Sequence, residues 1–270
     1  MRIGNRDFDT RHHTYIMGIL NMTPDSFSDG GSYDSLDAAL NRVETMISEG
    51  ADIIDVGGES TRLEYTQISD EEEIRRILPV IREIKKRFDV PVSVDTYKSA
   101  VAQAALEAGA DLINDIWGLK YDSQMGTVIA RSGAACCLMH NRPEPDYDDF
   151  VKDCLKDLEE TMTLAERAGI GKDRIILDPG VGVGFGKTLE QNLLVMKHLD
   201  TFNSFDVPVL LGTSRKSMIG LTLQTPSDQR VEGTLATTVM AVLAGVSFIR
   251  VHDILANRRA VIMTEAIRDV

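Results

Sequence analysis

Eight short apolar runs recur along the chain and alternate with longer amphipathic segments. The runs are rich in β-branched residues, nearly continuous in hydrophobicity and bounded by turn or charged residues, which is typical of strands buried on both faces of a parallel sheet. They occupy residues 14–20, 52–57, 91–95, 111–116, 134–139, 174–178, 208–212 and 247–253.

The amphipathic segments between the runs predict helices. Examples are residues 35–50, 69–88 and 147–169. In the second example Ser69 is followed three residues later by Glu72, which is a capping-box pattern. Several segments end in a glycine, which favours left-handed helix C-caps: Gly50, Gly109, Gly169 and Gly245.

Eight strands alternating with helices in about 250 residues are the signature of a (β/α)8 TIM barrel. The chain has no linker rich in Pro, Gly or Ser and no shift in composition, so the pattern predicts one α/β domain over residues 1–270. The alternative is a doubly wound open sheet, which would lack the closed eightfold count.

Composition narrows the class of protein. The 270 residues are 43% hydrophobic and 26% charged, as in ordinary soluble globular domains. No stretch approaches the roughly 18 consecutive apolar residues of a membrane span. The first 14 residues are charged and lack the apolar region of a secretory signal, so we expect a cytoplasmic protein that does not associate with membranes.

Charge and cysteine content exclude other classes. The net charge of −13 disfavours binding to nucleic acid and makes any basic cluster inside a cleft more informative. Cys136, Cys137 and Cys154 lack the CxxC spacing of metal sites. Two of them lie within an apolar run, which predicts inert core thiols.

Polar residues collect where the apolar runs end. In a (β/α)8 barrel the active site forms at the carboxyl ends of the strands. Taken singly, these residues have ordinary explanations: Asp95 could cap a helix, Lys216 could lie on the surface, and His252 could belong to the core. The agreement of eight strand ends predicts a site built from Asn21 and the Phe27 loop, residues 57–62, Asp95, Asn114–Asp115, residues 139–142, Asp178 with the glycine-rich residues 180–187, residues 213–217, and Arg250 with His252.

The basic members of this set indicate an anionic ligand. They are Arg62, Lys216, Arg250 and His252. Two of the four, Arg250 and His252, belong to the eighth run, and many barrels hold phosphate at strands seven and eight. The helix expected after Lys216 and Ser217 would direct its first N–H groups into the site, which suits a carboxylate or a phosphate.

The remaining polar residues suit a different kind of ligand. Asp95, Asn114 and Asp178 can accept hydrogen bonds from a flat heterocycle rich in N–H donors, and Phe27 and Phe185 can form aromatic walls. The residues therefore indicate a transferase or hydrolase that acts on a polar aromatic heterocycle carrying phosphate. They leave the heterocycle itself open.

Eight motifs, in order, closely resemble those of the dihydropteroate synthase family. They are GILNMTPDSFSDGG, DIIDVGGESTR, VSVDTYK, INDI, LMH, LDPG with GFGK, SRKSMIG and IRVHD, spanning about residues 14–255. The resemblance implies a pterin-binding (β/α)8 barrel of folate biosynthesis. It also implies condensation of 6-hydroxymethyl-7,8-dihydropterin pyrophosphate with p-aminobenzoate, release of pyrophosphate, a requirement for Mg²⁺ and a homodimer.

The resemblance also implies roles for individual residues. The pterin ring would contact Asp95, Asn114, Met139, Asp178, Phe185, Lys216 and Arg250. The pyrophosphate would contact Asn21, Thr61, Arg62, Arg250 and His252, with Asn21 as the metal ligand. The p-aminobenzoate pocket would be formed by Phe27, Thr61, Leu63, Lys216 and Ser217. The catalytic residues would be Asp95, Asp178, Lys216 and Arg250.

Three places depart from the family pattern. Leu63–Glu64 replace the usual Pro-Gly, which removes a fixed φ and an easy positive φ, so we hypothesise altered sulfonamide sensitivity. The GVGVGFGK loop is two residues longer than usual, which puts the placement of Phe185 and Lys187 in question. Residues 141–143 read Asn-Arg-Pro after LMH, and their contacts are unassigned.

Two alternatives remain open. A methyltransferase barrel that passes a methyl group from a folate to a corrinoid protein would share the ring-binding Asp and Asn, but it would not need the SRKS and RVHD anion cluster. A non-catalytic pterin-binding homologue would keep the ring pocket and lose activity through the altered second loop.

Overall fold

The computed structural model is a closed (β/α)8 barrel, described over residues 1–22, 32–59 and 67–270, with side chains of the first helix described from Ser35. Its parallel strands follow the order β8-β7-β6-β5-β4-β3-β10-β9. They are β3 (Tyr15–Asn21), β4 (Ile53–Gly57), β5 (Val92–Asp95), β6 (Leu112–Asp115), β7 (Ala135–Met139), β8 (Ile175–Asp178), β9 (Leu210–Leu211) and β10 (Phe248–Val251).

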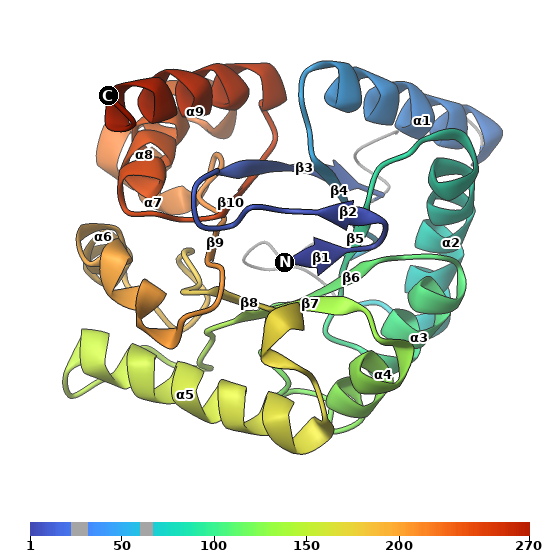
Figure 1. The fold of residues 1–270 in the computed structure, drawn as a ribbon, viewed down its shortest axis with the longest axis horizontal. Helices are drawn as coiled ribbons and strands as arrows, with labels where there is room; N and C mark the ends of the chain where they lie inside the picture. The colour runs from blue at the N-terminus through green and yellow to red at the C-terminus, as the bar shows by residue number, and fades with distance from the viewer. Residues whose placement is uncertain (23–31, 60–66) are drawn as a thin grey trace.

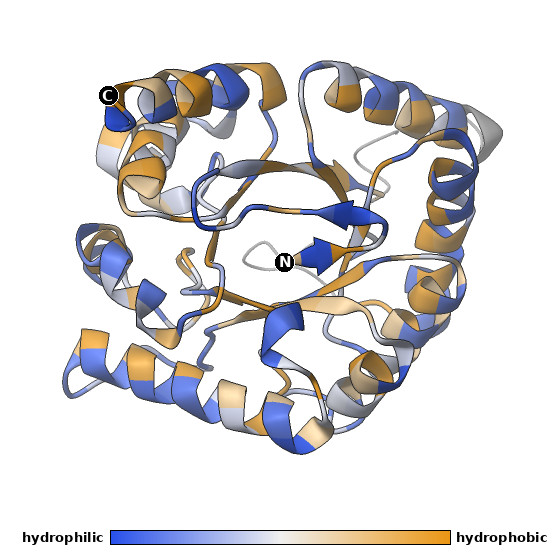
Figure 2. Cartoon of the chain, viewed as in Figure 1, coloured by the Kyte–Doolittle hydropathy of each residue, from blue (hydrophilic) through white to orange (hydrophobic). Residues whose placement is uncertain are grey.

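Helices surround the strands (Figure 1). They are α1 (Ser32–Ser48), α2 (Asp70–Arg87), α3 (Ser99–Glu107), α4 (Met125–Ser132), α5 (Phe150–Ala168), α6 (Leu189–Lys197), α7 (Ser217–Leu223), α8 (Val231–Leu243) and α9 (Ile254–Arg268). Short 3₁₀ turns lie at Lys172–Arg174, Leu199–Phe205 and Ser227–Gln229. Figure 2 shows the hydrophobic residues on the strands and in stripes along the helices, as the amphipathic pattern predicts.

The barrel prediction is confirmed and the open-sheet alternative is wrong. A parallel bridge between Leu177 and Val209 joins the two ends of the strand order, so the sheet closes on itself. Each strand overlaps its predicted run closely, and β3 extends one residue past its run to Asn21.

One element was not predicted from the sequence. An antiparallel hairpin, β1 (Arg2–Ile3) and β2 (Arg6–Asp7), crosses the barrel opening in Figure 1. Ile3 and Phe8 are buried against the interior of the barrel at the amino ends of its strands. This part of the interior is lined by Met17, Ile53, Leu112, Ala135, Cys137, Ile176, Leu210 and Phe248. This end of the barrel is therefore apolar and closed, and a polar ligand must enter from the carboxyl ends of the strands.

The predicted helix ends are largely confirmed. Gly50, Gly109, Gly169 and Gly245 all have positive φ, between +77° and +105°. The predicted capping box is half right: Ser69 accepts the N–H of Glu72 at 3.3 Å, but the Glu72 carboxylate binds Arg75 and Arg76 instead of returning to the Ser69 backbone. The guanidinium groups compete for this carboxylate because they lie one turn away on the same helix face.

The cysteine prediction is confirmed. Cys136, Cys137 and Cys154 are free and buried, and burial raises the pKa of Cys136 to about 12. Across residues 1–22, 32–59 and 67–270, none of the helices combines the length and the hydropathy needed to cross a membrane.

Candidate active site

The strand register brings the predicted residues together. Asn21 pairs with Gly57, Gly57 with Asp95, and Asp95 with Asn114, so four neighbouring strands end at one level. Met139 and Asp178 are paired in the same way on the next two strands. Convergence of these side chains at the carboxyl end of the barrel is thus a consequence of the register, as predicted.

Arg250 lies between two carboxylates. Its Nε donates to Asp55 Oδ2 at 2.6 Å, and its Nη2 donates to Asp95 Oδ2 at 2.7 Å. The Asp55 side chain is fully buried and the Arg250 side chain is 16% exposed, so the ion pairs are shielded from solvent. Asp55 was not among the predicted site residues, although a carboxylate inside the mostly apolar run 52–57 was a signal that pointed to it.

This cluster retains acceptors for a ligand. Asp55 Oδ1 and Asp95 Oδ1 are buried and have no hydrogen-bond partner within the described part of the chain. Burial raises the pKa of Asp95 to about 7, an effect that Arg250 opposes and Asp55 reinforces. Because unpaired buried acceptors are unfavourable, such a site gains most from a ligand that presents N–H donors.

A second pair, Asp178 and Lys216, faces the first. The N–H of Gly180 donates to Asp178 Oδ1 at 2.7 Å, and Lys216 Nζ donates to the carbonyl of Val181. Burial raises the pKa of Asp178, and Lys216 opposes this rise. Burial also lowers the pKa of the Lys216 ammonium to about 8, and the Asp178 carboxylate partly offsets this shift. Lys216 therefore carries its charge at a position shielded from water.

An apolar wall completes this side of the site. Tyr97, Ile116 and Met139 form a small buried cluster against which Trp117 and Phe185 pack. The Lys216 ammonium lies 5.1 Å from the centroid of the Phe185 ring. The longer glycine-rich loop therefore keeps Phe185 at the site, which answers the question raised by its length.

The loops after β9 and β10 are tied together. Ser214 Oγ lies 3.0 Å from His252 Nδ1 and accepts the His252 N–H at 3.1 Å. Arg215 donates through Nε to Asp253 Oδ2 at 2.9 Å, and α7 begins at Ser217 as expected. Lys216 and His252 thus lie on adjoining loops, with Arg250 on β10 just before His252, and Ser214, within the predicted segment 213–217, joins the two loops.

Four predicted residues, Phe27, Thr61, Arg62 and Leu63, lie outside the described residues, as do Glu64 and the rest of residues 23–31.

A buried ion cluster borders the segment 60–66. Lys98 Nζ donates to Glu59 at 2.7 Å, to Glu73 at 2.8 Å and to the Ile68 carbonyl at 2.8 Å. The Ile68 N–H donates to the Glu59 carboxylate at 3.0 Å, so residues on both sides of the segment share one anchor. Nothing in the spacing of these residues predicts the cluster, because it depends on contacts between three separate elements.

The predicted metal ligand, Asn21, lies at the end of β3. A Cβ at Gly57 would lie 3.7 Å from both Asn21 Oδ1 and Asp95 Cβ, so the Asn21 amide oxygen and Asp95 both lie next to the end of β4. Among the described residues no group of three or more His, Cys, Asp or Glu side chains could hold a metal by itself. Mg²⁺ commonly takes one or two protein oxygens and completes its shell with substrate phosphates and water, so this donor set fits it.

Comparison with known proteins agrees with this geometry. The family described as "Pterin binding enzyme" matches residues 17–252. A dihydropteroate synthase of Clostridium beijerinckii is 54% identical to the chain over 99% of each sequence.

Solved structures give the same result. Dihydropteroate synthase of Clostridium difficile, crystallised in the presence of pteroic acid, has a TM-score of 0.94 at 46% identity, covering 97% of this chain and 99% of that one. The Yersinia pestis enzyme in complex with a sulfonamide drug has a TM-score of 0.93 at 41% identity, covering 100% and 99%. The family resemblance is thereby confirmed: the chain belongs to the pterin binding enzymes and, within them, to the dihydropteroate synthases.

Proposed function

We propose that the chain condenses 6-hydroxymethyl-7,8-dihydropterin pyrophosphate with p-aminobenzoate to give dihydropteroate and pyrophosphate, as a cytoplasmic step of folate biosynthesis. The observation that carries this proposal is the buried set of opposed charges at the carboxyl end of the barrel, Asp55, Asp95 and Asp178 with Lys216 and Arg250. The set has one more carboxylate than cations, which suits a donor-rich ring that becomes cationic during reaction.

The pterin ring occupies the deep part of the site in this proposal. Asp95, Asn114 and Asp178 accept from or orient its N–H groups, and Lys216 moves from the Val181 carbonyl to an acceptor of the ring. Met139 and Phe185 supply the apolar walls. Every group named here is held by a strand end or by a short loop, so the pocket is preorganised for a rigid ligand.

The chemistry then needs charge stabilisation and positioning. The amine lone pair of p-aminobenzoate forms the new C–N bond while the C–O electrons leave with the pyrophosphate, and the amine releases one proton to solvent. Positive charge at the reacting CH₂ can delocalise into the dihydropterin ring, and the carboxylates of Asp95 and Asp178 favour that charge electrostatically. Holding the weak amine in line with the leaving group supplies the remaining advantage.

The leaving pyrophosphate lies toward β3 and β10 in this proposal. The family resemblance assigns its binding to Asn21, Thr61, Arg62, Arg250 and His252. Asn21 would hold Mg²⁺ together with pyrophosphate oxygens, and the ion would neutralise charge that develops on the leaving group. The family resemblance assigns the p-aminobenzoate side to Phe27, Thr61, Leu63, Lys216 and Ser217.

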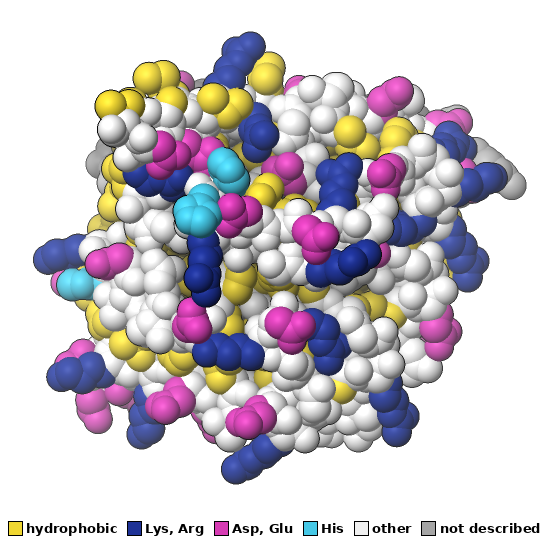
Figure 3. All heavy atoms as spheres, viewed as in Figure 1, with side chains coloured by type: hydrophobic (Ala, Val, Ile, Leu, Met, Phe, Trp, Pro, Cys, Tyr) yellow, Lys and Arg dark blue, Asp and Glu magenta, His cyan; other side chains and the backbone are white. Residues whose placement is uncertain are grey.

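The homodimer belongs to the same proposal, with a second copy of the chain packed on α8 and α9. Leu243, Ile262, Met263 and Ile267 are between 53% and 64% exposed on these two helices, and Figure 3 shows apolar atoms gathered along this edge of the molecule. Burial of such side chains is the usual driving force for association. Light scattering on the eluting protein should give twice the mass of one chain, and Met263→Asp should give the mass of one.

A direct assay tests the function. Purified protein is incubated with dihydropterin pyrophosphate, p-aminobenzoate and Mg²⁺, and the formation of dihydropteroate and pyrophosphate is measured. The proposal expects both products in equal amounts, and their loss when Mg²⁺ is chelated. Tight binding of dihydropterin pyrophosphate without product would instead identify a non-catalytic pterin-binding homologue.

A further inference from the structure

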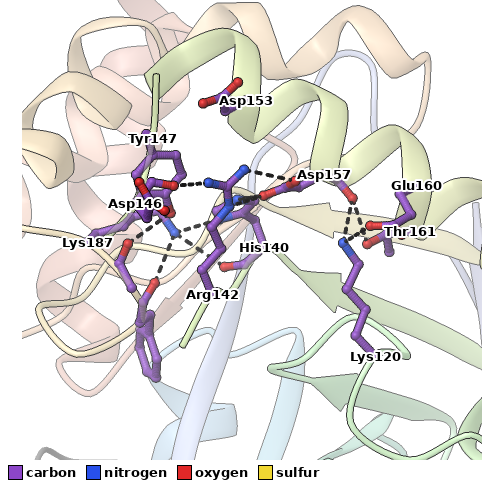
Figure 4. A network of polar contacts seen from close by, with 12 residues as sticks. Lys120, His140, Arg142, Asp146, Tyr147, Asp153, Asp157, Glu160, Thr161 and Lys187 are labelled. Atoms are coloured by element: carbon purple, nitrogen blue, oxygen red, sulfur yellow. Dashed lines mark hydrogen bonds and ion pairs between the residues drawn. The ribbon is translucent and has the colours of Figure 1, made fainter. Parts of the chain in front are cut away.

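A buried network of polar side chains lies against the glycine-rich loop (Figure 4). Lys187 Nζ lies 2.7 Å from His140 Nδ1, and His140 Nε2 lies 3.0 Å from Asp157 Oδ2. Lys187 and His140 are 3% and 2% exposed, so this network is inaccessible to substrate. The reaction proposed above does not use it. Its members come from three elements that are distant in sequence: the end of β7, the helix α5 and the end of the glycine-rich loop.

The contacts determine how each group is protonated. An ammonium at Lys187 donates to Nδ1, so Nε2 of His140 carries the ring proton and donates to Asp157. Burial lowers the pKa of His140 to about 4, which keeps the ring neutral. Burial would raise the pKa of Asp157, but hydrogen bonds from His140 and Arg142 lower it, so Asp157 ends the network as a carboxylate.

Arg142 and Tyr147 extend this support to the loop backbone. Arg142 binds Asp157 through Nε at 2.6 Å and Nη2 at 3.1 Å, and its guanidinium carbon lies 4.2 Å from the centroid of the Tyr147 ring. The Tyr147 hydroxyl donates to the Gly186 carbonyl at 2.9 Å. The Asn-Arg-Pro sequence after LMH thus has an assigned role, because its Arg joins α5 to the loop.

The backbone of the glycine-rich loop lies directly against this network. Gly180 and Gly186 have φ of +70° and +59°, and a Cβ at either one would clash with the carbonyl oxygen of His140 or Arg142. Lys187 Nζ also lies 3.4 Å from the His140 carbonyl and 3.5 Å from the Phe185 carbonyl. A change at Lys187 therefore reaches Phe185 directly through the Phe185 carbonyl and along the closely packed main chain of Gly186.

We propose that Lys187 is a positioning residue for the pterin site. Through its contacts with His140 and the main chain of the glycine-rich loop, it holds the Phe185 side chain at the wall of the pterin pocket. This inference rests on the proposed function, because it assigns Phe185 to the wall beside the pterin. Lys187 touches neither substrate. It acts by keeping a two-residue-longer loop in one conformation, so that the Phe185 ring stays beside Lys216 and Met139.

Lys187→Met tests this role, because it keeps the length of the side chain and removes its donors. We expect the Kd of dihydropterin pyrophosphate, measured by titration calorimetry with Mg²⁺, to rise at least about tenfold. The KM of p-aminobenzoate at saturating dihydropterin pyrophosphate should change less than about twofold. Lys120→Met is the matched control, since Lys120 donates to the Asp157 carbonyl at 3.0 Å and pairs with Glu160 at 2.8 Å, on the far side of the same helix turn in Figure 4. It should bind as the wild type does.

A double-mutant cycle separates positioning from general loss of structure. If Lys187 acts through Phe185, then Phe185→Ala with Lys187→Met should bind no more weakly than Phe185→Ala alone. Should Lys187→Met fail to give a cooperative unfolding transition, His140→Gln provides the second test, because its amide can still accept from Lys187 and donate to Asp157. That variant should bind within about threefold of wild type, and His140→Leu should lose as much as Lys187→Met.

Three results would overturn the inference: unchanged pterin affinity in Lys187→Met, equal losses in Lys187→Met and Lys120→Met, or full additivity with Phe185→Ala. A wild-type protein that neither binds dihydropterin pyrophosphate nor forms product would instead remove the proposed function, and the inference with it. The wild-type measurement thus tests the function, and the ratio of variant to wild type tests Lys187.

Discussion

The two ends of the barrel are built from the same strands and have opposite chemistry. At the amino end, Met17, Phe248 and their neighbours form an apolar layer that Ile3 and Phe8 close. At the carboxyl end, Asp55, Asp95 and Arg250 are buried with carboxylate oxygens left unpaired in the described residues. Burial of apolar area stabilises the fold, whereas buried charges contribute little net stability and leave binding capacity. One end therefore serves stability and the other serves function.

Removing Arg250 should have the largest effect. Arg250→Met leaves Asp55 and Asp95 buried without their cation, so we expect kcat/KM to fall about 10³-fold and the free energy of unfolding to fall by about 3–5 kcal/mol. Product formation and urea unfolding measure the two effects. Lys120→Met, at a half-exposed surface pair, should change neither. A variant with normal stability and no activity would show that the acidic cluster tolerates the loss of its cation.

Truncation at the closed end should affect stability alone. Phe8 packs on Tyr15 and Phe248 with ring centroids 4.8 and 5.7 Å apart, so Phe8→Ala should lower the free energy of unfolding by about 3 kcal/mol. Both KM values, measured well below the unfolding temperature, should stay within about twofold of wild type. A selective change in either KM would mean that the two ends are coupled.

The pH profile of kcat/KM should report the charges of the open end. The pKa of Asp95 is about 7 and that of Lys216 about 8, both shifted by burial. The Asp95 carboxylate forms as pH rises through 7 and the Lys216 ammonium is lost as pH rises through 8, so kcat/KM should be greatest between these values. Lys216→Arg, which keeps its charge, should lose the alkaline limb whatever its absolute rate. A flat profile from pH 6 to 9 would contradict this assignment.

The open end should itself divide between the two substrates. Phe27→Ala should raise the KM of p-aminobenzoate about tenfold and leave pterin affinity within about twofold, because Phe27 is assigned to the second substrate alone. Phe185→Ala, the matched removal of an aromatic wall, should weaken pterin binding instead. Equal effects of Phe27→Ala on both substrates would argue against this division.

The smallest expected effect concerns sulfonamides. Leu63–Glu64 stand where the family usually has Pro-Gly, so the double variant Leu63→Pro, Glu64→Gly should shift the inhibition constant of a sulfonamide, with the direction left to the measurement. The comparison with p-aminobenzoate KM in the same variant shows whether drug and substrate respond alike. An unchanged inhibition constant would remove the idea.

Much of this architecture was predictable because it depends on local pattern. Continuous apolar runs and amphipathic segments specify strand and helix alternation, and barrel closure follows from the count of eight. Polar residues at strand ends then specify where a site forms, so Asp95, Asn114, Asp178 and Arg250 could be selected before any contact was known. The residues alone indicated a ligand that is a heterocycle carrying phosphate. The identity of the two substrates and the reaction came from the resemblance of the motifs to a known family.

Other features depended on tertiary contacts. The closing hairpin consists of two-residue strands, too short for any periodic signal, and it is stabilised by what lies beneath it. Glu59 and Lys98 are ordinary charged residues in sequence, and only packing makes them a buried pair. The half-formed capping box at Ser69 shows the same limit, because Glu72 could reach either a backbone N–H or two arginines.

The amino-acid sequence by itself determined the element order, the end of the barrel at which the site forms and the strand-end residues that the register brings together there, since each follows from periodicity and from position along a strand. Tertiary structure alone decided the pairing of Arg250 with Asp55, the placement of Phe185 despite a longer loop, and the chain from Asp157 through His140 to Lys187. The physical reason is distance in sequence: these contacts join residues from separate elements, and their strength comes from burial that exists only after the barrel has closed.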